Sequence, residues 1–268
     1  AKAIKDVYLM DETDGKKIKY TFWHVGSMQS YYLVLPSVYS KKELDFSVYY
    51  NDRKYKVSID DEIYSSGEEW ENIQAESIYT LKIQDIWGRT CLEKPLQVLV
   101  SEELPAMMVT VDKKEALYID KKGTDKKYTE KGTVLLFDKE GNVELDAELE
   151  KIAVRGNTSA DLAKKPFRIE FKEPVSLCGM AESAEWNLLA NAKDGSHIRN
   201  KILLDWAGEL GDDYNVGCEF LELFVNGEYQ GLYLLTETIA IGDNKLEIDV
   251  DNSVLAEMEL YYRAVEED

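Results

Sequence analysis

The chain has 268 residues, of which 44% are apolar and 31% charged, so it can build a hydrophobic core and is not a wholly disordered protein. No apolar run approaches the ~18 residues that a transmembrane helix needs, so the sequence predicts no membrane span. The 32 basic and 52 acidic residues give a net charge of −20, and so acidic a surface repels a phosphate backbone, which argues against nucleic-acid binding.

Residues 1–103 show a β pattern throughout. Seven short segments rich in Tyr, Val and Ile are predicted to be strands: Ile4–Met10, Lys17–Val25, Tyr31–Pro36, Leu44–Tyr50, Arg53–Ile59, Ser77–Asp85 and Pro95–Glu102. Seven short strands in this length favour an immunoglobulin-like β-sandwich. No group of residues in this part is typical of a catalytic site, so we expect residues 1–103 to act as a spacer or as a binding platform.

A domain boundary is predicted near Ser101–Pro105, where charged residues and a proline follow the last strand. Beyond it, further strands are expected at Met107–Val111, Thr133–Asp138, Lys151–Arg155, Phe167–Phe171 and Trp186–Ala190. A helix is expected to start near Asp194, with Asp194 or Ser196 as the N-cap, and to end at Gly211. Its apolar residues recur at near-helical spacing: Ile198, Ile202, Leu203, Trp206 and Leu210.

A β-hairpin is the strongest local prediction in the second half. Phe220–Val225 leads into Asn226-Gly227, the commonest two-residue turn, and Tyr229–Thr236 returns. Thr238–Asp249 is predicted as a loop with a short strand, and Val254–Tyr262 as a strand or a helix. Strands and a helix without regular alternation favour an α+β domain over residues 104–268.

One segment carries a small net positive charge within the acidic chain. Residues 151–200 contain 8 basic and 6 acidic residues (+2), whereas residues 201–268 contain 3 and 17 (−14). The basic segment holds a glycine turn flanked by hydroxyl and cationic side chains: Arg155, Gly156, Asn157, Thr158, Ser159, Lys164, Lys165 and Arg168. A glycine turn followed by lysine and arginine suits a polyphosphate, since Arg can grip phosphate bidentately. It is not a Walker loop, and an ordinary basic hairpin is the alternative.

Four motifs in order resemble the CotH (spore coat protein H) kinase family. They are Arg155-Gly156-Asn157-Thr158-Ser159, then Lys164-Lys165-Pro166-Phe167-Arg168-Ile169, then the stretch from Trp186-Asn187-Leu188-Leu189-Ala190-Asn191 to Arg199-Asn200, and finally the hairpin from Val225 to Glu237. The resemblance covers about residues 104–268 and leaves residues 1–103 outside it.

The resemblance implies an atypical protein kinase that transfers phosphate from ATP to Ser or Thr of an unidentified protein substrate. The implied fold is the N-lobe half of a kinase. The implied catalytic residues are Lys165, Lys164 and Asp194, with Lys165 favoured over Lys164 for pairing to phosphate. The implied nucleotide-binding residues are Arg155, Gly156, Asn157, Thr158, Ser159, Arg168, Arg199 and Glu237. Structural roles stay open for three of these: Asp194 could only cap the helix, Arg199 could only pair with a carboxylate, and Glu237 could only end a strand.

The sequence departs from the family in its carboxylates. Phosphoryl transfer needs Mg²⁺, normally held by carboxylates, but the family's D-x-x-x-N-like and W-D-x-D-like motifs are absent. We expect the metal ligands, which stay unknown, to lie beyond Asp268, so that this chain binds nucleotide weakly and is inactive alone. The alternative is a noncatalytic adhesion or scaffold protein with a degenerate kinase-like domain. The expected location is the exterior of a bacterial cell, with any signal peptide outside this chain.

Overall fold

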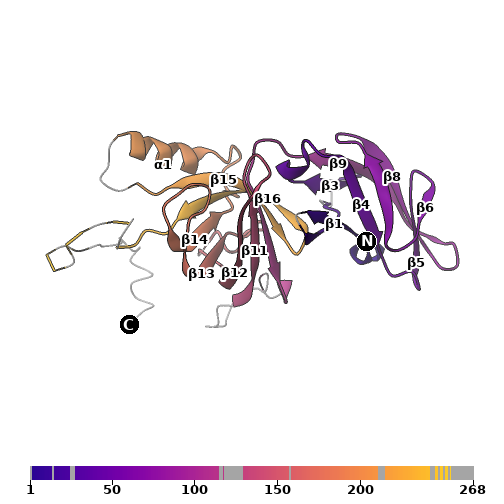
Figure 1. Ribbon diagram of the computed structural model, residues 1–268, viewed down its shortest axis with the longest axis horizontal. Helices are drawn as coiled ribbons and strands as arrows, with labels where there is room; N and C mark the ends of the chain where they lie inside the picture. The colour runs from indigo at the N-terminus through magenta and orange to yellow at the C-terminus, as the bar shows by residue number, and fades with distance from the viewer. Residues whose placement is uncertain are drawn as a thin grey trace.

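The structure of the chain is a computed structural model. It describes residues 2–13, 15–24, 28–114, 117, 129–156, 158–210, 215–241, 245–246, 248–249, 251–252 and 254. Over these residues the protein is mostly β. Two parts lie end to end along its longest axis, the N-terminal sheets at one end and a barrel at the other (Figure 1). The helix α1 (Arg199–Glu209) lies on the outside of the barrel, and no helix of the described ranges is long and apolar enough to cross a membrane.

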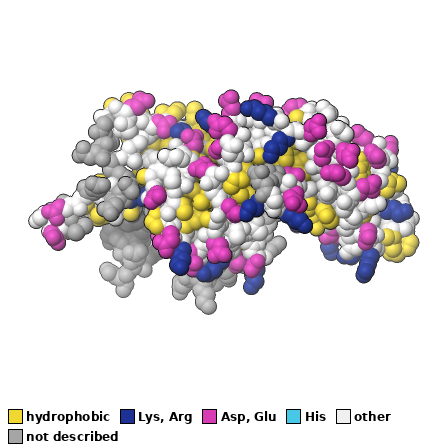
Figure 2. All heavy atoms as spheres, in the orientation of Figure 1, with side chains coloured by type: hydrophobic (Ala, Val, Ile, Leu, Met, Phe, Trp, Pro, Cys, Tyr) yellow, Lys and Arg dark blue, Asp and Glu magenta, His cyan; other side chains and the backbone are white. Residues whose placement is uncertain are grey.

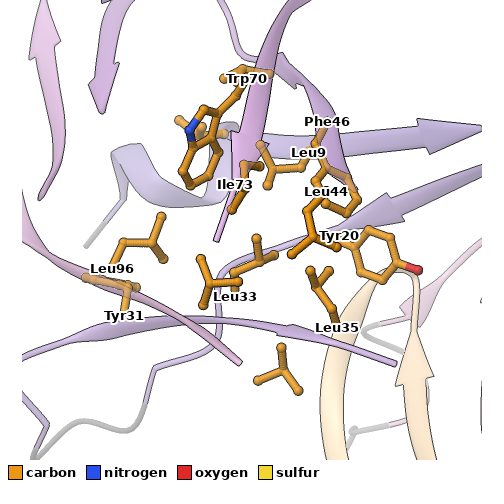
Figure 3. Close-up of a cluster of buried hydrophobic side chains, with 14 of the residues drawn as sticks. Leu9, Tyr20, Tyr31, Leu33, Leu35, Leu44, Phe46, Trp70, Ile73 and Leu96 are labelled. Carbon is orange, nitrogen blue, oxygen red and sulfur yellow. The ribbon is translucent and has the colours of Figure 1, made fainter. Parts of the chain in front are cut away.

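The N-terminal part consists of two sheets. The first has the order β2-β1-β4-β7, with bounds Lys16–Tyr20, Tyr8–Thr13, Leu44–Tyr49 and Glu68–Ile73. The second has the order β3-β9-β8-β5-β6, with bounds Tyr31–Leu35, Thr90–Val100, Ile78–Asp85, Tyr55–Ile59 and Glu62–Tyr64. Two short 3₁₀ helices, Ala3–Asp6 and Ser37–Tyr39, flank them. Alternating side chains on strands such as β4 point inward, and both sheets contribute to one apolar cluster that includes Leu9, Leu33, Phe46, Trp70 and Leu96 (Figure 3).

The second part is a closed barrel. Its seven strands run in the order β10-β11-β12-β13-β14-β16-β15, with bounds Ala106–Val111, Thr129–Phe137, Val143–Val154, Phe167–Val175, Ser183–Leu189, Glu228–Glu237 and Cys218–Val225. A parallel pairing of β10 with β15 closes it. Buried side chains from all seven strands form the second cluster, among them Met107, Leu136, Phe167, Trp186 and Leu223, so the interior is a packed core.

The first cluster continues across the junction between the two parts. Ala106, Met108, Phe137 and Phe224 belong to barrel strands but are buried in the N-terminal cluster. The Asn226-Gly227 turn reaches the same region, where Gly227 O accepts a hydrogen bond from the Thr21 N–H at 2.9 Å. The two segments on either side of the predicted boundary, residues 1–103 and 104–268, therefore share one hydrophobic core.

The structure overturns the predicted fold class. The α+β domain and the kinase N-lobe half predicted for residues 104–268 are wrong, because this segment forms a β-barrel with a single α-helix among its described residues. For the first part, where an immunoglobulin-like sandwich was predicted, the structure has two sheets, one of which pairs β3 with β9 in parallel. The error has a physical cause: the barrel is closed by pairings between distant segments, and the spacing of apolar residues along the chain does not encode them.

The helix is shorter than predicted. It begins at Arg199 instead of near Asp194 and ends at Glu209. The hairpin is as predicted, with Asn226 and Gly227 both at positive φ in the turn between β15 and β16. Apart from Val254, the C-terminal segment predicted as Val254–Tyr262 lies outside the described part of the chain.

Candidate anion-binding site

The glycine turn connects β12 to β13. The Arg155 N–H donates to Pro166 O at 3.0 Å and so extends the ladder by one residue. Gly156 has φ +83°, a backbone conformation that favours glycine, and a Cβ there would lie 2.3 Å from Ser159 Oγ, so that a larger residue would also need the Ser159 side chain to rotate. Thr158 is exposed at the tip, and Asn157 lies outside the described residues. The turn is therefore tightly closed on Ser159.

Two arginines lie on neighbouring strands beside this turn. Arg168 pairs with Ala153 in the β12–β13 register, so Arg168 and Arg155 share the outer face of the barrel wall. Burial, and secondarily the charge of Arg168, lowers the pKa of Arg155. Arg168 Nη1 lies 3.5 Å from Glu185 Oε2, while its buried Nε has no hydrogen-bond partner among the described residues. Arg155 forms no ion pair with any described side chain. Of these two neighbouring guanidinium groups, only that of Arg168 lies near a carboxylate, an arrangement suited to an anion.

The two predicted lysines are bound to backbone carbonyls. Lys165 Nζ donates to Ala160 O at 2.6 Å, which holds the loop after the glycine turn. Lys164 Nζ donates to Leu232 O on β16 and lies 4.6 Å from the centroid of the Tyr233 ring. Tyr233 Oη in turn donates to Lys165 O at 2.7 Å. Both lysines therefore fasten the loop to the barrel, and their pairing with phosphate stays a prediction.

The Lys164 amine is expected to titrate near pH 8 in the folded protein, because burial lowers its pKa from 10.5 to about 8. The folded protein then loses this proton before the unfolded chain does, so the contribution of Lys164 to the free energy of unfolding rises with pH from about 8 to 10.5. Acylation of Lys164, followed by peptide mass spectrometry across pH 6–11, measures the midpoint. Denatured protein is the control and should show a midpoint near ~10.4. A native midpoint equal to the denatured one would contradict the expectation.

Asp194 lies at the start of α1. Its carboxylate accepts the Ser196 hydroxyl at 2.7 Å and the Arg199 N–H at 3.0 Å, and Arg199 Nε is 3.6 Å away. The hydrogen bond from the Ser196 hydroxyl, followed by that from the Arg199 N–H, lowers the pKa of Asp194 to about 2. Asp194 and Arg199 are thus brought together at the helix terminus, and no contact between described residues joins them to the arginine pair.

Glu237 is buried at the end of β16, beside Trp186 of β14. Its Oε2 lies 3.8 Å from Lys245 Nζ and accepts the Gly217 N–H at 3.3 Å. Lys245 Nζ also lies 5.7 Å from the Trp186 ring. Sequence reasoning missed Lys245, because no motif contains it and only the fold brings it to Glu237.

Asn187 is a second residue that the sequence prediction omitted, although the family motif includes it. It pairs directly with Arg168 across β13 and β14 and therefore lies on the same face as the arginines. Its Nδ2 donates to Glu237 O at 3.4 Å and to Thr238 Oγ1 at 3.2 Å, while its buried Oδ1 has no partner among the described residues. Asn187 thus adds an available acceptor beside the cationic pair.

Comparisons with known proteins cover this part of the chain. Residues 152–263, which include the glycine turn, the arginine pair and α1, match the family model of the CotH kinase protein. Over this segment, the resemblance to the CotH family predicted from its motifs is confirmed. A curated relative is inner spore coat protein H of Bacillus subtilis (strain 168), which is 38% identical over 88 residues. The aligned region is 33% of this chain and 23% of that protein, so the chain matches less than a quarter of its relative.

Proposed function

We propose that the chain is part of a CotH-like atypical protein kinase that transfers phosphate from ATP to Ser or Thr of a protein substrate. One observation carries the proposal: the half-buried Arg155 lies beside Arg168 without a carboxylate partner among the described residues. Bringing two guanidinium groups together without a second carboxylate is unfavourable unless an anion binds between them. The match to the CotH family makes the phosphates of a nucleotide the leading candidate for that anion.

The residues present fit the phosphates better than they fit the metal. Arg155 and Arg168 would hold phosphate oxygens through charge-assisted hydrogen bonds, and ATP would supply the phosphoryl group. Among the described residues, no group of three His, Cys, Asp or Glu side chains could hold a metal ion. Mg²⁺ thus has no assigned site among the described residues. Gly156 fixes the turn that positions Arg155, and Lys165 fixes the following loop.

Replacing Arg155 by methionine is expected to weaken ATP binding by roughly tenfold or more, since a hydrogen bond to a charged group contributes ~1.5–3 kcal/mol. Isothermal titration calorimetry with ATP, with and without Mg²⁺, measures the loss. Arg53→Met is the matched control, because Arg53 lies in an exposed turn of the N-terminal part. Equal affinities of Arg155→Met and the unsubstituted protein would refute the assignment of phosphate to this arginine.

A noncatalytic scaffold is the second candidate function. It is favoured by the lack of a carboxylate cluster among the described residues and by the backbone contacts that occupy Lys164 and Lys165. Incubation with radiolabelled ATP, Mg²⁺ and a Ser/Thr-rich acceptor separates the two candidates. Labelled acceptor that disappears with Arg155→Met supports the kinase. Tight ATP binding without transfer, in a chain extended to full length, supports the scaffold.

We propose a location at the surface of a bacterial cell or spore. The support is the segment shared with inner spore coat protein H, a protein named for the spore coat. Immunofluorescence on intact cells and spores, compared with permeabilised ones, tests this location. Signal restricted to permeabilised cells would contradict it.

A further inference from the structure

A cavity of about 410 Å³ lies at the junction between β2 and the outer wall of the barrel, within the size range of ligand-binding pockets. Along one side run consecutive residues of β2, from Lys16 to Lys19. Along the other side lie residues of β10 and β11, including Met108 and Leu135. Asn226 and Gly227 complete its lining. We call this cavity the junction groove.

One side of the junction groove is the free edge of a sheet. β2 is the outermost strand of its sheet, and β1 is its one partner among the described strands. The Thr21 N–H points away from β1, because it donates to Gly227 O. Backbone groups alternate in direction along a strand, so those of Lys17 and Lys19 also point outward. Among the described residues, no backbone hydrogen bond takes up the Lys17 N–H, the Lys17 carbonyl or the Lys19 N–H on this side.

The junction groove is basic in a strongly acidic chain. Lys17 and Lys19 are exposed on β2, and burial and then the charge of Lys114 lower the pKa of Lys19. Lys16 forms an ion pair with Asp146 of β12, which also lines the groove, and Lys114 forms one with Glu228. Lys17 and Lys19 form no ion pair with a described residue. Figure 2 shows acidic side chains scattered over the visible face with Lys and Arg side chains among them, and the chain as a whole has a net charge of −20.

We propose that the junction groove binds an extended segment of a partner protein with alternating acidic and small apolar side chains, which adds as a strand to the free edge of β2. Backbone hydrogen bonds to Lys17 and to the Lys19 N–H would supply the pairing, as in other cases of strand addition to a sheet edge, while Gly227 packs against the Lys19 carbonyl. Acidic side chains would neutralise the two lysines, and apolar ones would cover Met108 and Leu135.

The chemistry of the groove favours such a partner over a second copy of this chain. A second copy that paired edge to edge would place β2 lysines against β2 lysines, and like charges opposite one another destabilise a strand pair. Lysines on an edge strand also discourage indiscriminate pairing. An acidic strand would instead be attracted to the lysines of β2. These lysines therefore disfavour pairing between two copies of the chain and favour an acidic partner segment.

Fluorescence anisotropy with a labelled seven-residue peptide of alternating Glu and Val tests the proposal, with a Lys–Val peptide as the comparison. The doubly substituted Lys17→Glu/Lys19→Glu protein should bind the Glu–Val peptide at least tenfold more weakly. Asp146→Asn should bind it severalfold more tightly, because Lys16 is released from its ion pair. Lys54→Glu, in an exposed turn of the other sheet, is the control and should bind as the unsubstituted protein does.

Lys17→Pro separates strand addition from simple charge attraction. It removes the outward N–H but leaves the pairing of β2 with β1 intact, since proline is tolerated where an edge N–H faces outward. Weaker binding that retains its salt dependence supports the proposal. If this variant does not fold, as judged by circular dichroism, the double lysine variant decides alone. Equal binding of both peptides, unchanged affinity in the double variant, or a β2-dependent dimer that excludes the peptide would overturn the proposal.

Discussion

Replacing Gly227 by alanine should lower the free energy of unfolding by about 2–5 kcal/mol. Gly227 has φ +80°, and a Cβ there would lie 2.3 Å from Lys19 O, a backbone atom that cannot swing aside. The substitution would therefore push the β15–β16 turn away from β2. It should also weaken the hydrogen bond from the Thr21 N–H to Gly227 O. Urea unfolding followed by circular dichroism measures the change.

Gly15→Ala is the matched control for this prediction. Gly15 also has a positive φ of +73°, but no atom lies within 4 Å of its would-be Cβ. Alanine at Gly15 should therefore show only the conformational cost, about 1–2 kcal/mol. The difference between the two variants isolates the contact at the junction. If both variants lose the same stability, the close approach of Gly227 to β2 contributes nothing.

Trp186→Ala should destabilise the barrel by about 3–5 kcal/mol, the usual cost of deleting a large buried aromatic side chain. Trp186 is fully buried, and its indole N–H donates to Ser183 O at 2.9 Å. Its removal would also take away the ring beside Lys245. Denaturant unfolding monitored by circular dichroism avoids dependence on tryptophan fluorescence.

The chain provides a control with the same side chain. Trp206 lies on α1 and is 56% exposed, so Trp206→Ala should change the free energy of unfolding by less than about 0.5 kcal/mol. Trp186→Phe should fall between the two, because it keeps most of the volume and loses the hydrogen bond. A Trp206→Ala variant as unstable as Trp186→Ala would show that burial does not govern the difference.

Local features of the fold were predictable from the sequence where neighbouring residues determine them. The Asn226-Gly227 hairpin is confirmed because the turn requires residues that tolerate positive φ. The apolar stripe of the helix also lies where expected, but Ile202, Leu203 and Trp206 are more than half exposed. Spacing along a helix shows that apolar side chains share a face, and it does not show what that face contacts.

The candidate site was predictable only in part, for a similar reason. Arg155 and Arg168 stand at the two ends of the connection between β12 and β13, so antiparallel pairing of these strands brings them together. The partners of the lysines were not predictable, because Leu232 is far along the chain and the barrel alone brings it to Lys164. The parallel pairing of β10 with β15 joins residues more than a hundred positions apart, and such pairings leave no local pattern.

The shared hydrophobic core has a thermodynamic consequence for both proposed ligands. Phe137 and Phe224 of the barrel are buried among side chains of the N-terminal sheets. Unfolding of either part would therefore expose apolar side chains of the other part to water. The halves should therefore melt in a single cooperative transition. A nucleotide at Arg155 or a strand along β2 would then raise the melting temperature of both parts, by an amount that grows with the logarithm of the ligand concentration above its Kd. The melting temperature measured by calorimetry can thus report a ligand bound to one part through the stability of the other part.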